Sequence, residues 1–239
     1  PGGAAPPIPN PGRPGATRRG GSGGWGGWGG IFTTDDAGAT WAERLGSVAV
    51  YSLAQDQQNK DNFWAATNQG IYKSINNGVT WTKQTASSLP SSNTSRTELA
   101  IAPSNGNVVY ALFAGGPTGT EFWRTVNGGS SWTKMSSGSN ACDGQCTYNM
   151  TIAVHRTNSD IVYRGTVLLF KSINGGSTWT QLTNGWGGSQ QVHQDTQELL
   201  VDPVAPETFY VGSDGGVWRS ADGGTSYTCL NTNLNMTQF

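Results

Sequence analysis

The sequence has little charge and no long apolar run. Only 12% of its 239 residues are charged, and 14 Lys and Arg against 15 Asp and Glu leave a net charge of −1. A surface of balanced charge lacks the positive potential that attracts phosphate backbones, so nucleic acid is not expected as a partner. The longest apolar stretches, such as residues 161–167 and 208–212, are far shorter than the roughly 20 residues that span a bilayer. We therefore predict a protein that does not span a membrane.

Cysteine is also scarce, with three residues in the chain. Cys142 and Cys146 form a CxxxC pair without a second pair. This spacing suits zinc poorly, whereas a short loop closed by a disulfide suits an exported protein. Cys229 is left over, either as a buried free thiol or as the partner of a cysteine elsewhere. We predict a Cys142–Cys146 disulfide, no metal site and no cofactor.

The first thirty residues differ in composition from the rest, with twelve Gly and six of the eleven Pro. Residues 1–24 have no apolar period that could offset the entropy of ordering, so we predict a flexible arm or linker there. The same stretch lacks the basic start and apolar run of a signal peptide, so an export signal would lie upstream and be removed. We expect the protein to be secreted, attached to the cell surface, or periplasmic.

One short pattern occurs five times in the remainder of the chain. It consists of Ser or Thr, any residue, Asp or Asn, any residue, Gly, two residues and an aromatic residue. Its aromatic positions are separated by 40, 51, 47 and 48 residues, which identifies a repeat protein. The five octamers, called boxes below, are Thr34-Asp36-Gly38-Trp41, Ser74-Asn76-Gly78-Trp81, Thr125-Asn127-Gly129-Trp132, Ser172-Asn174-Gly176-Trp179 and Ser220-Asp222-Gly224-Tyr227.

Each box has the residues of a tight turn. Asp or Asn hydrogen-bonds its own backbone two residues on, and Gly supplies a positive φ without steric cost. The aromatic residue is expected to fold back as an apolar plug between neighbouring sheets. The basic residue before four of the boxes is expected at a solvated edge; these residues are Lys73, Arg124, Lys171 and Arg219.

Strand patterns surround each box, with an aromatic or aliphatic segment before it and two further apolar segments upstream. Four strands per 40 to 51 residues is the arithmetic of a propeller blade, with the small apolar strand innermost. We predict an all-β propeller with four-stranded blades over residues 25–239: a partial first blade, four fuller blades and the start of another. Either the chain is part of a larger propeller, or residues 236–239 return to complete blade one in a five-bladed ring.

The boxes resemble the Asp-box repeats, also called bacterial neuraminidase repeats, of sialidases, xyloglucanase-type glycosidases, the sortilin ectodomain and many secreted bacterial proteins. The resemblance covers residues 25–239. It implies a propeller whose boxes lie at the blade periphery, between the third and fourth strands, with a structural rather than a catalytic role. Fold does not by itself define function, so the site residues must be judged separately.

A polar cluster at residues 190–198 precedes the fifth innermost strand, where it is expected at the mouth of the central channel. In related bacterial repeat proteins this position often reads His-x-Asp-x-His, and Gln197 stands here for the second His, which weakens a metal site. His193 and Asp195 remain candidates for ligand binding. Together with Glu198 they are also candidates for catalysis, against the alternative of a polar plug for the strand ends. The aromatic rings of Trp25, Trp28 and Trp186 lie in Gly-rich segments, where they could stack on sugars or partner side chains.

These patterns favour a non-enzymatic scaffold at the cell surface that binds a protein or a glycan. The alternative is a glycoside hydrolase, sialidase-like or xyloglucanase-like, or a fragment of one, which would need two opposed carboxylates near His193, Asp195 and Glu198. A third interpretation is a subunit of a surface assembly that contacts a neighbouring subunit through the arm of residues 1–24.

Overall fold

The computed structural model describes residues 29–86, 89–90, 96–116, 119–138, 145–184 and 192–232. They form one two-stranded and four four-stranded antiparallel sheets, which we number as blades 1 to 5 along the chain. Blade 1 is β1 (Gly30–Thr33) and β2 (Ala42–Gly46), and blade 2 is β3 (Val50–Gln55), β4 (Phe63–Thr67), β5 (Gly70–Ser74) and β6 (Thr82–Lys83). Blade 3 is β7 (Thr97–Ala102), β8 (Asn105–Gly116), β9 (Gly119–Thr125) and β10 (Thr133–Gly138). Blade 4 is β11 (Thr151–Val154), β12 (Val162–Gly165), β13 (Leu169–Ser172) and β14 (Thr180–Gln181); blade 5 is β15 (Thr196–Val201), β16 (Phe209–Ser213), β17 (Gly216–Ser220) and β18 (Thr228–Cys229).

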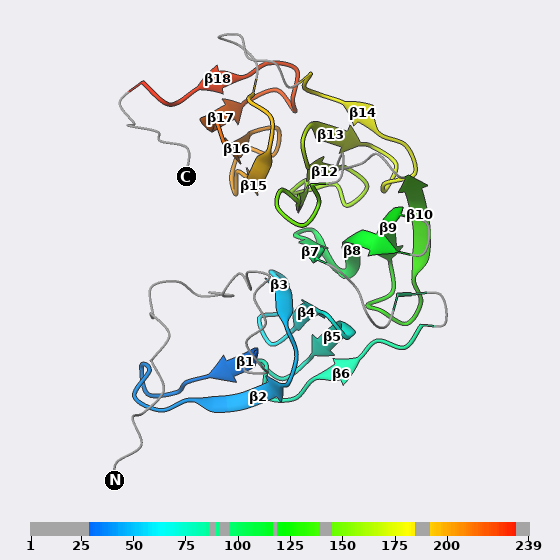
Figure 1. Ribbon diagram of the computed structural model, residues 1–239, viewed down its shortest axis with the longest axis vertical. Coiled ribbons are helices and arrows are strands. Elements are labelled where there is room, and N and C mark those ends of the chain that lie inside the picture. Colours follow the sequence, from blue (N-terminus) through cyan, green and yellow to red (C-terminus); the bar gives the residue numbers. More distant parts are fainter. Residues whose placement is uncertain are drawn as a thin grey trace.

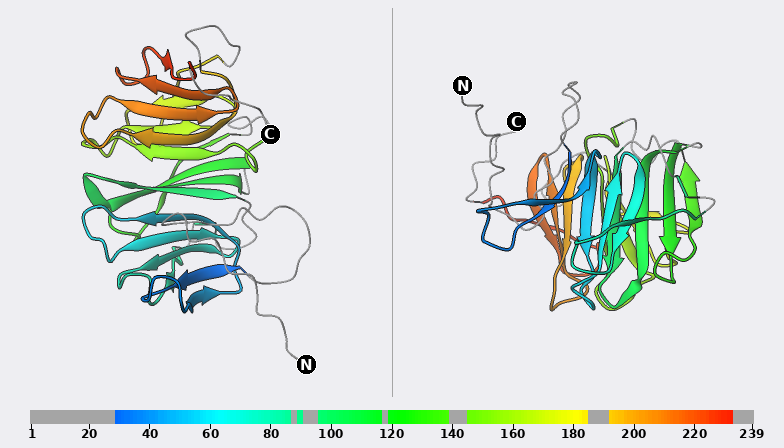
Figure 2. Two further views of the ribbon diagram at one scale, coloured as in Figure 1. Left: turned by 90° about the vertical axis from the view of Figure 1, so that its left-hand side faces the viewer. Right: turned by 90° about the horizontal axis from the view of Figure 1, so that it is seen from below.

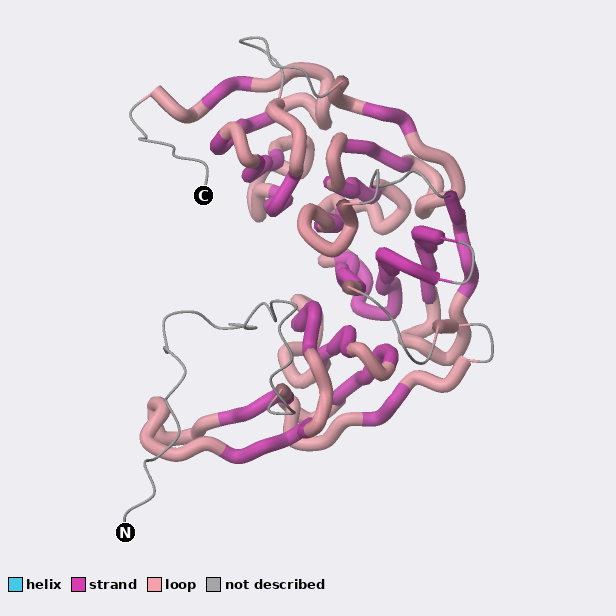
Figure 3. Tube along the Cα trace, viewed as in Figure 1, coloured by secondary structure: helices cyan, strands magenta, loops and turns pink. Residues whose placement is uncertain are grey.

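The blades follow one another around an open arc (Figure 1). The first strand of each four-stranded blade lies nearest the centre, and neighbouring innermost strands β3, β7, β11 and β15 contact one another in turn. Figure 2 shows the sheets stacked face to face along the arc, and the described chain in Figure 3 consists of strands and loops. The predicted all-β propeller fold and its innermost strands are therefore confirmed. Residues 233–239, on which the five-bladed alternative depends, lie outside the described residues.

No helix in the part of the chain that the structure describes has both the length and the apolar character needed to cross a membrane.

Every box joins the last two strands of its blade and has the same hydrogen bonds. In blade 4, the Ser172 hydroxyl accepts a hydrogen bond from the backbone N–H of Gly176 (2.8 Å) and donates one to Asn174 Oδ1 (3.0 Å). The Asn174 amide then accepts from the backbone N–H of Thr178 and donates to the Thr178 hydroxyl, both at 2.9 Å. The box glycine takes a positive φ, 91° for Gly176. The predicted positive φ of the glycine is thus confirmed, whereas the predicted bond of the Asp or Asn side chain to the backbone two residues on is wrong, because the side chain accepts from the N–H four residues on.

The predicted octamer omits one member of this network. The residue before the aromatic is bound to the Asp or Asn side chain in each box, and it is Thr40, Thr80, Ser131, Thr178 or Ser226. A hydroxyl at this position in all five repeats is visible in the sequence, so the repeat alignment alone could have found it.

Two of the box aromatics, Trp132 and Trp179, pack between blades, as predicted. Trp132 of blade 3 meets Trp64 of blade 2 edge to face, with ring centroids 5.8 Å apart. Trp179 of blade 4 meets Phe122 of blade 3 in the same way at 4.9 Å. Trp41 of blade 1 stays 42% exposed, because no described sheet precedes it in the arc. The burial of a box aromatic therefore depends on the presence of the preceding blade.

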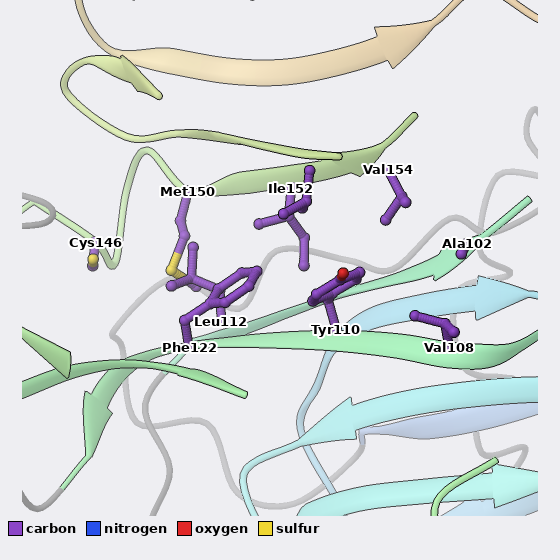
Figure 4. Close-up of a cluster of buried hydrophobic side chains, with 10 residues drawn as sticks. Ala102, Val108, Tyr110, Leu112, Phe122, Cys146, Met150, Ile152 and Val154 are labelled. Atoms are coloured by element: carbon purple, nitrogen blue, oxygen red, sulfur yellow. The ribbon is translucent and has the colours of Figure 1, made fainter. Parts of the chain in front are cut away.

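Between blades 3 and 4 lies a buried apolar cluster (Figure 4). Tyr110 and Phe122 of blade 3 stack with centroids 5.4 Å apart, and Met150, Ile152 and Val154 cover them from blade 4. Small inner strands and large aromatic second strands fill the space between the sheets, which explains the composition of each repeat.

Three of the four basic residues before the boxes, Lys73, Arg124 and Lys171, contact the following blade. Lys73 lies 5.0 Å from the centroid of Trp64 and donates a hydrogen bond from Nζ to the carbonyl oxygen of Gly128, in the box of blade 3. Lys171 repeats this with Tyr163 and with Gly223 in the box of blade 5. The expectation of a solvated edge is therefore wrong for Lys73 and Lys171, because their ammonium groups donate to carbonyl oxygens of the following blade. The expectation also fails for Arg124, whose side chain is 15% exposed and pairs with Asp160, and it holds for the exposed Arg219.

Acid should weaken the two boxes that contain Asp. Hydrogen bonds from Thr40 lower the pKa of Asp36 to about 2, and hydrogen bonds from Ser226 lower that of Asp222 to about 2, both from 3.8. A lowered folded-state pKa stabilises the fold above the unfolded value, and this stabilisation is lost as the pH falls through the folded value. We expect the D36N/D222N variant to lose less thermal stability than the wild type between about pH 4 and pH 2.

Circular-dichroism melts at a series of pH values measure this difference. The variant should fold normally, because boxes 2 to 4 already carry Asn at the same position with the same hydrogen bonds. Parallel melting temperatures of the two proteins over this range would contradict the assignment.

Candidate functional site

The candidate residues lie where the innermost strands begin. Arg96, Asn149 and Asp195 occupy the one or two positions before β7, β11 and β15. Because these three strands are neighbours around the arc, their first residues meet at one end of the propeller. Asp195 has a positive φ of 65°, and the backbone N–H groups of Asp195 and Thr196 donate to the carbonyls of Val167 and Thr166 in blade 4.

Asp195 is joined to blade 4 through its side chain as well. Its carboxylate accepts a hydrogen bond from Nδ2 of Asn149, a residue with no exposed surface. Burial raises the pKa of Asp195, the nearby Asp214 carboxylate raises it further, and the Asn149 bond and the His193 charge oppose both. Asp214 in turn accepts from Gln197 Nε2 at 3.1 Å.

His193 and Glu198 are both exposed. The His193 ring nitrogen Nδ1 lies 3.1 Å from the carbonyl oxygen of Gln194, while Asp195 binds Asn149, so the two candidate residues are neighbours without a hydrogen bond between them. Gly215 lies directly beneath His193, because a Cβ on Gly215 would come within 2.3 Å of the histidine Cβ. The His193 side chain is therefore seated on the hairpin that carries Asp214.

Arg96 and Glu98 form the second half of the candidate site, although neither was predicted from the sequence. The Arg96 guanidinium binds Glu98 at 2.8 Å and donates to the carbonyls of Tyr148 (2.5 Å) and Met150 (2.6 Å), on either side of Asn149. Burial raises the pKa of Glu98; the Arg96 charge opposes this rise and the Glu198 charge adds to it. An Arg-x-Glu pair at the start of an inner strand was the available sequence signal.

Together these residues form a polar band across blades 3 to 5, which we define as Arg96, Glu98, Asn149, Asp195, Gln197 and Asp214. Each carboxylate in the band has a donor from an amide or a guanidinium. Within the described residues, no group of three or more His, Cys, Asp or Glu side chains is placed to hold a metal ion.

Removing the arginine of the band should be costly. Arg96→Met deletes the partner of a buried carboxylate and the donor to two carbonyls, so we expect a loss of about 2 kcal/mol in the free energy of unfolding. Urea unfolding measures the loss. The double variant R96M/E98L removes the orphaned charge and should recover part of it; no recovery would show that the carboxylate is not the source of the cost.

Several predicted residues lie outside the described part of the chain: Trp25, Trp28, Trp186, Cys142 and the arm of residues 1–24. Cys146 is buried and disulfide-bonded, and Cys229 is a free thiol. The pairing of Cys146 with Cys142 stays a prediction.

The fold and the repeated box define a β-propeller built from repeated four-stranded blades. The model of the DUF6242 beta propeller domain matches residues 28–186, and the chain belongs to this family. Among curated proteins, none matches the chain.

Solved structures with the same fold include enzymes and a protein bound to a peptide. The GH74 enzyme of Niastella koreensis is 20% identical with a TM-score of 0.58, over 82% of this chain and 27% of that one. The GH74 xyloglucanase of Xanthomonas campestris is 15% identical with a TM-score of 0.58, over 87% of this chain and 31% of that one. YCF48 from Cyanidioschyzon merolae is 13% identical with a TM-score of 0.51, over 76% of this chain and 55% of that one, and another YCF48 structure is bound to a D1 peptide. The chain thus spans less than two thirds of each of these proteins, and at these identities the likeness concerns the fold.

Proposed function

We propose that this domain is a non-catalytic scaffold that binds a glycan at the polar band, outside the cytoplasm. The observation that carries the proposal is the alternation of amides and carboxylates at the innermost strand ends. Asp195, Gln197 and Asp214 are partly exposed there, and His193 and Glu198 are exposed beside them. Such planar donors and acceptors suit the hydroxyl groups of a sugar.

The pairing within the band favours binding over catalysis. Asp195 is held by Asn149, Asp214 by Gln197, and Glu98 by Arg96. A general acid or base must be free to exchange its proton with the substrate, whereas each of these carboxylates is already hydrogen-bonded, Asp195 to the neighbouring blade and the other two within their own blades. This arrangement matches the polar plug that a scaffold requires, and a rigid set of polar groups lowers the entropic cost of binding.

A panel of neutral oligosaccharides, including xyloglucan and cellulose fragments, tests the proposal by isothermal titration calorimetry. We expect at least one saturable binder, and Asp195→Ala should weaken its affinity at least tenfold. Arg156→Ala serves as the matched control, because Arg156 binds Gln57 beside the loops at the other end of the strands. Absence of binding to the whole panel, with binding of a protein partner instead, would overturn the glycan assignment.

A glycoside hydrolase is the second candidate, and one observation favours it. Asp195 has a raised pKa beside a second carboxylate, Asp214, and a pair of nearby carboxylates, one of them with a raised pKa, is the arrangement of glycosidases. Release of reducing sugar from xyloglucan by the wild type, abolished in Asp195→Asn and Asp214→Asn, would replace the scaffold proposal with this one.

A further inference from the structure

Arg164, on β12, breaks the pattern of the repeat. Its strand partners are Ile152 on β11 and Phe170 on β13. The register places three apolar residues at the same position of the other four-stranded blades, each with no exposed surface; these are Ala65, Ala111 and Val211. The blade therefore does not need a charge at this position, and its presence in blade 4 requires another explanation.

Two aromatic rings hold the Arg164 guanidinium. Its central carbon lies 4.5 Å from the centroid of Phe170 and 4.6 Å from that of Trp179. The Trp179 ring is itself fixed, because Nε1 donates to the Ser136 hydroxyl of blade 3 at 3.2 Å. Both contacts are cation–π contacts, which attract the guanidinium without neutralising its charge.

Among the described residues, the guanidinium has no counter-ion. Nε is buried without a hydrogen-bond partner, and no ion pair joins Arg164 to any described residue. The two terminal nitrogens are not among the buried unpartnered atoms, so they are open to solvent. Burial lowers the pKa of Arg164 to about 10, which leaves the group charged at neutral pH. A desolvated, unpaired charge is unfavourable for folding, while the apolar residues of the other blades avoid that cost.

We propose that Arg164 anchors the carboxylate of an acidic sugar, which makes it an anion subsite of the glycan-binding scaffold. The inference rests on the proposed function and extends it to uronate-bearing glycans. The guanidinium presents parallel N–H groups along its edge, and this fork matches the two oxygens of a planar carboxylate. The contacts with Phe170 and Trp179 limit the movement of the side chain, so less rotamer entropy is lost when the ligand binds.

The test uses methyl β-D-glucuronide as the acidic probe and its methyl ester as the neutral one. We expect the acid to shift the NMR signal of the Arg164 Nε–H group saturably, with an affinity at least tenfold higher than that of the ester. Arg164→Ala should abolish binding. Because Ala65 and Ala111 occupy the same position elsewhere, this variant should fold with an unchanged or raised melting temperature. Arg156→Ala should bind as the wild type does.

The remaining outcomes separate the two proposals. Binding of a neutral oligosaccharide at the polar band, with no response of the Arg164 signal to the glucuronide, overturns the anion subsite and leaves the scaffold standing. Equal affinity for glucuronide and acetate overturns the assignment of a sugar acid. A lower melting temperature of Arg164→Ala with unchanged glucuronide binding would show that the aromatic contacts are structural and would overturn the subsite. If neither the glucuronide nor any neutral oligosaccharide binds, both proposals fail.

Discussion

Gly176→Ala should destabilise the protein by about 2–5 kcal/mol, for two reasons that add. Gly176 has φ of 91°, a backbone conformation that costs an L-residue roughly 1–2 kcal/mol. An added Cβ would also lie 2.3 Å from Cε1 of Phe122 in the neighbouring blade. Phe122 is 1% exposed and packed between Tyr110 and Trp179, so it cannot move aside, and overpacking of this kind adds about 1–3 kcal/mol.

Gly38→Ala is the matched control for that substitution. Gly38 holds the same box position with φ of 95°, yet its added Cβ would meet only the Trp41 ring at 3.7 Å or more. This variant should therefore show the backbone cost alone, about 1–2 kcal/mol. Chemical unfolding of both variants measures the difference. Equal losses would mean that the contact between blades at Phe122 contributes nothing.

Trp64→Ala should be equally damaging, with a loss of about 3–5 kcal/mol in the free energy of unfolding. Trp64 is 1% exposed. Trp132, from the box of blade 3, packs edge to face against its ring, and the ammonium group of Lys73 lies over the same ring. Lys73 also donates to Gly128 in the box of blade 3. The substitution therefore opens a cavity where two blades meet, and the loss can be measured by urea denaturation.

Trp41→Ala provides the contrast, because the Trp41 ring is 42% exposed and its removal deletes little buried contact. We expect a loss below about 1 kcal/mol for this exposed residue. Comparable losses at Trp41 and Trp64 would refute the dependence of the box aromatic on the preceding blade.

The repeat was readable in the sequence because its chemistry is local. The box hydroxyl, Asp or Asn and Gly bond to one another within six residues, as Ser172, Asn174 and Gly176 do, so composition and spacing alone define the turn. The strand pattern and its period then led to the propeller. The hydroxyl of Thr178 and of its equivalents belongs to the same local pattern, so it could have been predicted in the same way.

The site was only partly predictable because its contacts cross blades. Asp195 and His193 stood out as a polar cluster, but the partner of the Asp195 carboxylate lies far away in sequence, since Asn149 is 46 positions from it. Lys73 reaches Gly128 across 55 positions, which no local pattern reveals. The exceptional character of Arg164 depends on the strand register, which gives Ala65, Ala111 and Val211 the equivalent position in the other four-stranded blades.

The basic residues before the boxes give the arc a polarity. Lys73 holds the box of blade 3 and Lys171 that of blade 5, always from the earlier blade to the later one. Coupling of this kind acts between nearest neighbours, as in linear repeat arrays, where stability is a sum of units and shared boundaries. Local unfolding of one blade therefore weakens the box of the following blade before it weakens the box of the preceding blade. Unfolding should thus spread preferentially toward the later blades.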